Sequence, residues 1–559
     1  MMQFYRKTIK TREKYVDTLA KLYEYATAAH TKRQFTQYYD TKEGGYTFAE
    51  FKDACDSLSK ILTQYGLGSG EKIAIFSQSM PNWSVAFFSA VSFGRIAIPI
   101  LPDSSENEVN NIVSHSGSRA LFVSKRLLSK VSGEVMSKMT LVIDMDSLEI
   151  IKADESSFTC DGKSSVPTPD DIATIIYTSG TTGSAKGVVL SHRNLASNVI
   201  TCYHSCPRGR NDRWLSLLPM AHTLEMTIGM LYPMFCGATV YYLQKPPVPA
   251  LLLKAMKVVK PTTILSVPLI IEKIYKGSVL PTIRGSRTLT WMESHANRLM
   301  CLIIGMKLKS TFGGHVSFFG IGGAKLDSEV ESFLLKARFP YAIGYGLTET
   351  SPLLGYSMHG WRTVGSLGYP VYNVKLKLHD INPETGEGEI VAKGPNVMLG
   401  YYKDPSRTKS VFTEDGWFRT NDLAVQDAKG RFFIKGRKNN MILGASGENI
   451  YPEEIESVIN NIEGVTESIV VERKGRLIAL VQPCEGFVDC DKDSEDKIYE
   501  KLEGWKDRIL KGVNRNVSKT SQVSSVEVMK EPFEKTATQK IRRFKYKDSA
   551  PTVESEKKK

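Results

Sequence analysis

The chain has 559 residues, of which 42% are hydrophobic and 24% charged, values that are ordinary for a globular protein. This length allows about two to four domains. The formal net charge of +13 suits nucleic acid, an anionic membrane surface or a polyanionic small substrate. The sequence lacks an Arg-rich helix, zinc-finger spacing and an aromatic-studded basic strand, so nucleic acid is the least favoured of the three.

The sequence carries no signal for secretion or membrane spanning. Residues 1–15 are polar and charged, without the apolar segment of a signal peptide. No apolar run reaches the length of about 18 residues that a spanning helix needs. Cys202 and Cys206 have no second pair to complete a zinc site, so we expect free thiols in a reducing compartment. The expected location is cytoplasmic, with optional peripheral contact at the inner face of the membrane.

The first 170 residues predict helices alternating with strands. Residues 1–60 are expected to be largely helical, and Thr47 with Glu50 predicts a capping box for a helix that ends near residue 62. Apolar runs predict strands at 72–76, 97–100, 121–123 and 140–143, and a helix at 81–93. Residues 152–170, rich in Ser, Thr, Gly, Pro and Asp, predict a loop. This alternation predicts a parallel sheet with helices on both faces.

The stretch Tyr177–Val188, YTSGTTGSAKGV, follows an apolar run at 173–176 that predicts a buried strand. Its glycines let backbone N–H groups approach an anion, its hydroxyls are donors, and Lys186 adds a positive charge. A flexible Gly/Thr-rich surface turn is the alternative interpretation. The strand before the stretch and the apolar residues after Lys186 favour phosphate binding. The pattern is not a Walker loop, because glycine does not directly precede Lys186.

Two segments in the middle of the chain leave alternatives open. Residues 214–225 predict a strand end that opens into a helix, and His222 alone is typical of a structural histidine there. Residues 280–312 mix basic and apolar side chains without a clean helical period. This segment predicts either a helix packed on the main domain with a solvated basic face, which the residues alone favour, or a basic insert that contacts anionic lipid.

Glycine-rich segments at 318–326 and 341–352 each follow a predicted strand. Tyr345 lies between two glycines, an arrangement in which an aromatic ring can stack on a purine. Thr348 offers a hydroxyl to a phosphate, and Glu349 offers a hard oxygen to Mg²⁺. Taken alone, this pattern is more typical of a structural glycine-rich turn.

The last third of the chain predicts two smaller units. Residues 375–435 alternate short β-rich runs with glycine turns, which predicts a small antiparallel barrel or sheet. After the polar turn at 436–440, residues 456–530 predict a helix, two strands, a helix and a strand. Lys540 stands among several basic residues, so a solvated charged face is the alternative to a catalytic role. Residues 549–559 are expected to be disordered.

Tyr177–Val188 resembles the phosphate loop of the acyl-adenylate-forming enzymes, with Ala185 where that family usually has proline. The other family segments follow in the family's order over residues 45–545. The resemblance implies an α/β fold with a large N-terminal domain at 1–436, made of mixed, largely parallel sheets with helices and a small β subdomain. It also implies a hinge at 437–440 and a mobile α+β lid at 441–548.

The resemblance further implies the site residues. Those expected at ATP are Thr178, Ser179, Gly180, Thr181, Thr182, Gly183, Lys186, Gly323, Ala324, Tyr345, Gly346, Asp422 and Arg437. Mg²⁺ is expected on Glu349 and coenzyme A at Gly447 and Glu448. The implied catalytic residues are Lys540, Thr348, Glu349 and His222. Two positions depart from the family: Asn421 replaces a glycine but tolerates positive φ, and Gln539 precedes Lys540 where glycine is usual.

The implied activity is that of bacterial long-chain fatty acid–CoA ligases. Such an enzyme converts a fatty acid and ATP to acyl-adenylate and pyrophosphate, then transfers the acyl group to coenzyme A and releases AMP. One alternative is a ligase that uses acyl carrier protein as acceptor, since the basic chain also suits an acidic carrier. Another is a non-catalytic, nucleotide-dependent lipid-binding protein, which the presence of Thr348, Glu349, Asp422, Arg437 and Lys540 disfavours.

Overall fold

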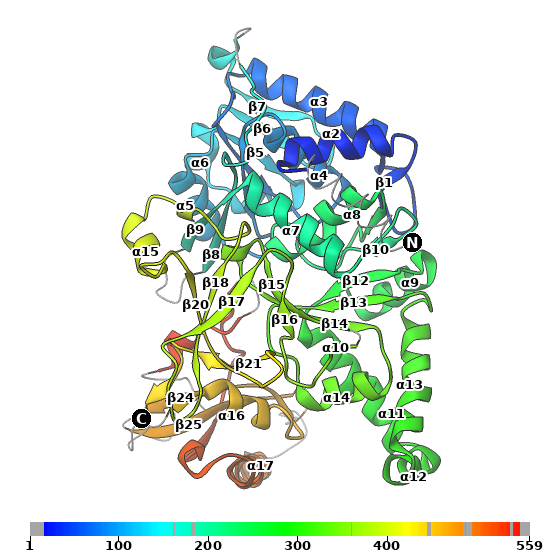
Figure 1. The fold of residues 1–559 in the computed structure, drawn as a ribbon, viewed down its shortest axis with the longest axis vertical. Coiled ribbons are helices and arrows are strands. Elements are labelled where there is room, and N and C mark those ends of the chain that lie inside the picture. The colour runs from blue at the N-terminus through cyan, green and yellow to red at the C-terminus, as the bar shows by residue number, and fades with distance from the viewer. Residues whose placement is uncertain are drawn as a thin grey trace.

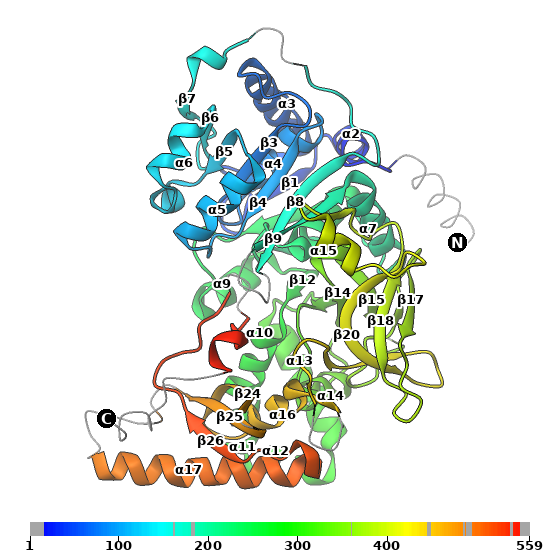
Figure 2. The same ribbon diagram turned by 90° about the vertical axis from the view of Figure 1, so that its left-hand side faces the viewer.

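The protein is described by a computed structural model that covers residues 16–159, 163–179, 185–358, 360–443, 449–473, 475–484, 487, 495–536 and 540–547. Figure 1 shows the N-terminal helices and strands at one end of the molecule and the C-terminal elements at the other. In Figure 2 the long helix α17 (Glu495–Asn516) lies along the C-terminal end.

The first large sheet has eight strands in the order β19-β9-β8-β4-β3-β5-β6-β7. Its strands are β3 (Lys72–Phe76), β4 (Ile96–Ile100), β5 (Ala120–Val123), β6 (Leu141–Asp144), β7 (Ile150–Ala153), β8 (Ile172–Ser179), β9 (Ala185–Ser191) and β19 (Gly400–Tyr401). The central strands, from β8 through β6, run parallel, whereas β7, β9 and β19 pair antiparallel. The predicted parallel sheet is therefore confirmed, with antiparallel edges added.

The second large sheet has nine strands in the order β16-β15-β14-β13-β12-β10-β11-β1-β2. Its strands are β1 (Gln34–Tyr38), β2 (Tyr46–Thr47), β10 (Arg213–Leu215), β11 (Thr239–Tyr242), β12 (Thr263–Ser266), β13 (Phe318–Ile321), β14 (Tyr341–Gly346), β15 (Leu353–Ser357) and β16 (Tyr369–Pro370). The expectation of a largely helical segment at 1–60 is wrong for β1 and β2. Because β1 pairs with β11, some 200 residues later, tertiary pairing outweighs local preference there.

The helices pack on both faces of these sheets. In the first third of the chain they are α2 (Leu19–Ala29), α3 (Phe48–Gln64), α4 (Pro81–Val91), α5 (Glu106–Ser116) and α6 (Gly133–Lys138). Those that follow are α7 (His192–Ser205), the π-helix η3 (Glu225–Leu231), α8 (Tyr232–Cys236), α9 (Pro249–Val259), α10 (Pro268–Ile274), the π-helix η4 (Tyr275–Val279), α11 (Leu280–Arg284), α12 (Arg287–His295), α13 (Asn297–Thr311), α14 (Ser328–Lys336) and α15 (Pro405–Ser410). The predicted capping box at Thr47 and Glu50 begins α3 and is confirmed.

The core follows the alternation of side chains along the strands. In β3, Ile73 and Ile75 pack in the central cluster with α3, α4 and α7, while Ala74 and Phe76 pack on the outer side with α5. In the second sheet, Trp214 belongs to the same central cluster, while its neighbour Leu215 packs with α9, α13 and α14. The large part of the chain thus stacks helices and sheets in five alternating layers. Burial of side chains on both faces explains why these strands are nearly continuous apolar runs.

Two smaller units complete the fold. The antiparallel sheet β17-β18-β20-β21 consists of Lys375–His379, Gly388–Lys393, Phe418–Gln426 and Phe432–Arg437, as predicted for 375–435. After the short pair β22 (Ile442–Leu443) and β23 (Asn449–Ile450), the C-terminal unit comprises α16 (Pro452–Ile459), β24 (Val465–Arg473), β25 (Arg476–Pro483), α17 and β26 (Ser525–Val528). The predicted order of helix, two strands, helix and strand is confirmed.

Candidate active site

One cavity of about 1250 Å³ opens where the parallel strands of the nine-stranded sheet end. Strand ends of this kind are where α/β folds place their ligands, because loops diverge there. The cavity brings together residues from distant parts of the sequence. The predicted site residues that line it are Thr178, Lys186, His222, Gly323, Ala324, Tyr345, Gly346, Thr348, Glu349, Arg437 and Lys540.

Several predicted residues lie outside the described part of the chain. Among the described residues, β8 ends at Ser179 and β9 begins at Ala185, so the structure brings both flanks of the predicted phosphate loop to the site. The predicted residues not described are Gly180, Thr181, Thr182, Gly183, Gly447 and Glu448. Their roles remain predictions.

Lys186 and Glu349 form the charged centre of the cavity. The Lys186 Nζ donates to Glu349 Oε1 at 2.9 Å, and the Tyr401 hydroxyl donates to the same oxygen at 2.9 Å. Burial opposes ionisation of Glu349, but the charge of Lys186 and the two hydrogen bonds outweigh it and lower the pKa of Glu349. The carboxylate is therefore ionised at neutral pH. This ionised carboxylate and the hydroxyl of the neighbouring Thr348 offer hard oxygen ligands, which suit Mg²⁺.

Tyr401 is a site residue that the sequence interpretation missed. It lies on β19, which pairs with β9 so that Tyr401 is opposite Val188. The Lys186 Nζ also lies 4.6 Å from the centre of its ring. Tyr401 is separated from Lys186 by over 200 residues, and one of two adjacent tyrosines before a lysine carries no distinguishing signal in the sequence.

Asp422 joins the predicted adenine segment to the predicted hinge. Its Oδ2 accepts from the Tyr345 hydroxyl at 2.8 Å, and its Oδ1 pairs with Arg437 Nε at 2.8 Å. Asp422 is buried, which raises its pKa, while Arg437, Tyr345 and Lys540 oppose that rise. Asn421 has a φ of +62°, so asparagine supplies the left-handed turn that the family makes with glycine.

Gly346 is required by a close approach of the backbone. A Cβ atom at this position would lie 1.8 Å from the carbonyl oxygen of Pro352. A side chain would therefore push β14 away from the segment before β15. That shift would move Tyr345 on one side of Gly346 and Glu349 on the other.

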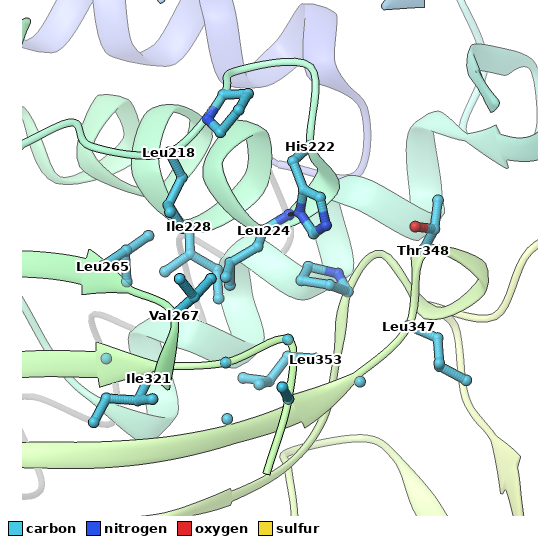
Figure 3. Close-up of a pocket in the computed structure, with 18 of the residues that line it drawn as sticks. Leu218, His222, Leu224, Ile228, Leu265, Val267, Ile321, Leu347, Thr348 and Leu353 are labelled. Carbon is cyan, nitrogen blue, oxygen red and sulfur yellow. Dashed lines mark hydrogen bonds between the residues drawn. The ribbon is translucent and has the colours of Figure 1, made fainter. Parts of the chain in front are cut away.

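His222 stands at the junction between the polar centre and an apolar branch of the cavity (Figure 3). Its Nδ1 accepts from the Leu224 backbone N–H at 3.2 Å, so the neutral ring carries its proton on Nε2. Burial and the nearby charge of Lys540 lower the pKa of His222 to about 4. The ring is therefore a neutral hydrogen-bond donor near pH 7.

The apolar branch is built from both sides of the cavity. Figure 3 shows leucine, isoleucine and valine side chains converging from the loop and π-helix after β10 and from the strands of the sheet. The labelled apolar residues are Leu218, Leu224, Ile228, Leu265, Val267, Ile321, Leu347 and Leu353. A branch of this composition is suited to an apolar group next to the polar centre.

Lys540 reaches this cavity from the C-terminal unit. The Thr536 backbone N–H donates to the Lys540 carbonyl at 2.8 Å, and the Arg542 N–H donates to the Glu534 carbonyl at 2.9 Å. These bonds pair the two arms of a hairpin. Burial and the charge of Arg437 lower the pKa of Lys540, while Asp422 and Glu349 oppose that change. Lys540 lines the cavity beside these groups, yet the residue as a whole is exposed, so its catalytic role stays a prediction.

The described residues also bear on metal binding and membrane spanning. Within the residues that the structure describes, no group of three or more His, Cys, Asp or Glu side chains could hold a metal ion. Cys202 packs in the central core rather than at a zinc site. None of the described helices is long and apolar enough to cross a membrane.

Comparison with known proteins identifies the family. Residues 24–402 match the AMP-binding enzyme family, and the chain belongs to it. It is similar to the peroxisomal long chain acyl-CoA synthetase 6 of Arabidopsis thaliana, with 31% identity over 74% of this chain and 64% of that protein. It is also similar to the chloroplastic long-chain-fatty-acid–[acyl-carrier-protein] ligase AEE15 of the same plant, with 27% identity over 90% of this chain and 82% of that protein.

Solved structures show the same fold. The ATP-bound MatB from Rhodopseudomonas palustris has a TM-score of 0.74 and 22% identity, covering 94% of this chain and 97% of its own. The O-succinylbenzoate coenzyme A synthetase MenE from Bacillus subtilis, in complex with ATP and magnesium ion, has a TM-score of 0.74 and 22% identity, covering 94% of this chain and 99% of its own. The predicted α/β architecture of this family is therefore confirmed.

Proposed function

We propose that this protein is an AMP-forming acid–thiol ligase that activates a fatty acid with ATP and passes the acyl group to coenzyme A. The observation that carries the proposal is that Lys540 lines the same cavity as Lys186, Glu349 and an apolar branch. The cations suit a reaction between two anions, ATP and a carboxylate, and the apolar branch suits the hydrocarbon chain of the acid. The similarity to long-chain acyl-CoA synthetases supports this substrate class.

In the first half-reaction, a carboxylate oxygen of the fatty acid attacks the α-phosphorus of ATP. The bond from that phosphorus to the bridging oxygen of pyrophosphate breaks, and acyl-adenylate forms. Lys186 would neutralise the leaving pyrophosphate, and Lys540 would lie between the two reacting anions. His222 would donate from Nε2 to the acyl carboxylate or the α-phosphate. Mg²⁺, held by Glu349 with Thr348 beside it, would supply charge neutralisation on the phosphates.

The nucleoside would be held by the unit of Tyr345, Asp422 and Arg437. The Asp422 oxygens already bind Tyr345 and Arg437, so the carboxylate is fixed in position before the ribose hydroxyls arrive. Such preorganisation lets the ribose bind without reordering the side chain. Gly323, Ala324 and Gly346 would let the backbone approach the base closely.

In the second half-reaction, the thiol of coenzyme A would attack the acyl carbonyl and AMP would leave. We propose that residues 1–436 form the main domain, 437–440 the hinge and 441–548 a lid that rotates between the two half-reactions, with 549–559 as a tail. Rotation would withdraw Lys540 and bring the loop with Gly447 and Glu448 to the thiol. The short connection around Arg437, which touches Asp422, supports a pivot at this position.

Coenzyme A is the proposed acceptor, and the cytoplasm is the proposed location. Acyl carrier protein is the alternative acceptor, because a relative named as a carrier-protein ligase covers 90% of the chain. A non-catalytic lipid-binding protein is disfavoured by the joint placement of Lys186, Glu349 and Lys540 around one cavity. We place the enzyme in the cytoplasm.

Contact with an anionic membrane has its own supporting observation. On α13, Leu299, Ile303 and Met306 are 54%, 43% and 67% exposed. Their spacing of four and three residues puts them on one helix face. Exposed Trp291 on α12 adds an aromatic group, and α12 lies at an extremity of the molecule in Figure 1. Arg and Lys side chains in this segment suit anionic headgroups.

Co-sedimentation with vesicles tests the membrane contact. Binding to vesicles that contain anionic lipid should fall strongly in Met306→Glu. It should remain in Ile381→Glu, since Ile381 is 55% exposed in the turn between β17 and β18 and serves as a matched control. Equal binding by both variants would contradict a membrane role for α13.

Acid-dependent exchange of pyrophosphate into ATP tests the activity itself. Purified protein is incubated with Mg²⁺, ATP and a panel of fatty, aryl and amino acids, with long-chain fatty acids expected to give the fastest exchange. Thioester formation is then compared with coenzyme A and with acyl carrier protein as acceptors. Exchange with none of the acids would overturn the proposed function and favour the binding protein.

A further inference from the structure

Within the part of the chain that the structure describes, the hairpin that carries Lys540 is tied to the N-terminal part by one ion pair. Arg542 Nη2 lies 2.8 Å from Glu108 Oε1, and the two side chains are 21% and 31% exposed. Glu108 is on α5, more than 400 residues before Arg542. Among the described residues, the other polar contacts between the C-terminal unit and the rest of the protein involve α16 and its surroundings, and they include Tyr451 to Glu387, Lys276 to Asn460 and Asn461 to Asp327.

Arg542 lies on the same hydrogen-bonded hairpin as Lys540. The residues are two positions apart on one arm of the hairpin, whose arms are paired by the bonds of Thr536 with Lys540 and of Arg542 with Glu534. The Glu534 carboxylate also holds Arg542 Nε at 3.3 Å. A hairpin tied in this way transmits the position of Arg542 to the lysine.

Glu108 is an equally fixed point on the other side. It is the third residue of a capping box, in which its Oε2 accepts from the Ser105 backbone N–H at 2.9 Å while Oε1 faces Arg542. At the far end of α5, His115 Nδ1 lies 2.7 Å from the Tyr177 hydroxyl. Tyr177 directly precedes Thr178 of the predicted phosphate loop. Helix α5 therefore spans from the Lys540 hairpin to the strand that carries that loop.

We propose that the Glu108–Arg542 ion pair is the latch that holds the lid in its adenylation position and sets Lys540 against the reacting phosphate. Arg542 is then a positioning residue that acts through Lys540, and its partner on α5 is fixed relative to the phosphate loop. The latch must open before the thiol can enter, so it favours the first half-reaction and not the second. This inference rests on the proposed function and adds a specific device to it.

The proposed latch depends on the opposite charges of Glu108 and Arg542. Burial raises the pKa of Glu108, but the hydrogen bonds from Ser105 and the charge of Arg542 outweigh it, so the net pKa is lowered and the carboxylate is ionised. Hydrogen bonds between charged partners are stronger than neutral ones, yet this pair is part-exposed and screened by salt. Loss of the pair should therefore lower the equilibrium constant for the adenylation position by roughly twofold to fivefold.

Half-reaction kinetics of Glu108→Gln and Arg542→Ala test the latch. Glutamine keeps an oxygen for the Ser105 N–H but removes the charge that binds Arg542. Each variant should slow pyrophosphate exchange by roughly twofold to fivefold and leave thioester formation from supplied acyl-adenylate unchanged or faster. The double variant should lose no more than either single one, because both remove the same interaction. Lys545→Ala, which breaks a contact within the C-terminal unit to Glu534, is the control and should match the wild type.

The outcomes separate the latch from the proposed function. Absence of exchange in the wild type would overturn the function itself. An active wild type with unaffected variants, with equal losses in both half-reactions, or with additive losses in the double variant would overturn the latch. If Arg542→Ala fails to fold, Glu108→Gln alone decides, since its change is confined to a surface helix cap. Raised salt should reproduce the effect in the wild type and not in either variant.

Discussion

Replacing Lys186 by methionine tests the charge balance at the centre of the cavity. Lys186 is 25% exposed and its partner Glu349 is 10% exposed, so the variant leaves a largely buried carboxylate without its cation. Removal of one partner from a buried pair costs about 3–5 kcal/mol in the free energy of unfolding. Because the Tyr401 hydroxyl remains and Glu349 can take up a proton, we expect a loss of about 2 kcal/mol.

The assay combines thermal unfolding with pyrophosphate exchange. Lys186→Met should melt several degrees below the wild type, and the double variant with Glu349→Gln should recover most of that loss because no buried charge is left unpaired. Exchange should fall by about 100-fold or more in both variants, since each lacks the cation at the leaving group. Lys138→Met, which breaks the exposed pair with Glu134, is the matched control and should change neither property.

The reasoning would be refuted in two ways. If Lys186→Met melted at the wild-type temperature, Glu349 would not depend on Lys186 for its ionised state. If the double variant regained exchange activity along with stability, the lysine would serve only to balance the carboxylate and would have no role at the pyrophosphate.

Three further predictions concern nucleotide binding and titration. Asp422→Asn weakens the unit that fixes Arg437 and Tyr345, so initial rates should show KM for ATP raised by roughly tenfold or more, with a smaller change in kcat. Lys540 must be charged to act, and burial and Arg437 lower its pKa, so pyrophosphate exchange should decline with rising pH below the ordinary lysine value of about 10.4. Lys540→Arg should remove that decline. Buried Glu225 has a pKa of about 8, so its contribution to stability is full below its unfolded value and is lost as pH rises through about 8. The melting temperature of Glu225→Gln should lack this loss between about pH 5 and 9.

Each of these predictions has a contrary result. An unchanged KM for ATP in Asp422→Asn would remove Asp422 from the nucleotide site. An alkaline decline that persists in Lys540→Arg would assign it to another group. If the melting temperatures of the wild type and of Glu225→Gln changed with pH in the same way, burial would not raise the pKa of Glu225 as inferred.

The sequence predicted local structure well where the local signal is strong. The capping box of α3, the strands β3 to β6 and the order of elements in the C-terminal unit all follow from residue spacing and apolar runs. The signal failed at β1, which is a strand because it pairs with β11 in the tertiary fold. It also gave no sign of the π-helix at Glu225–Leu231, whose backbone bonds depend on its buried surroundings.

The sequence predicted which residues belong to the site, but not the contacts that join them. The motif order predicted Lys186, Glu349 and Lys540, which line one cavity, yet nothing in the sequence showed that Tyr401 contacts the first two. The same limit applies to Glu108 and Arg542, two ordinary charged residues far apart in the chain. Such contacts depend on how helices and the C-terminal unit pack, which local periodicity does not encode.

The two half-reactions of Lys540→Ala test the central claim most directly. In one measurement the variant is assayed for acid-dependent pyrophosphate exchange, and in the other for thioester formation from supplied acyl-adenylate and coenzyme A. We predict a fall of about 100-fold or more in the first, as for the loss of one charge partner in the transition state, and a much smaller change in the second. Equal loss in both half-reactions would contradict the role of Lys540 and the two-position lid.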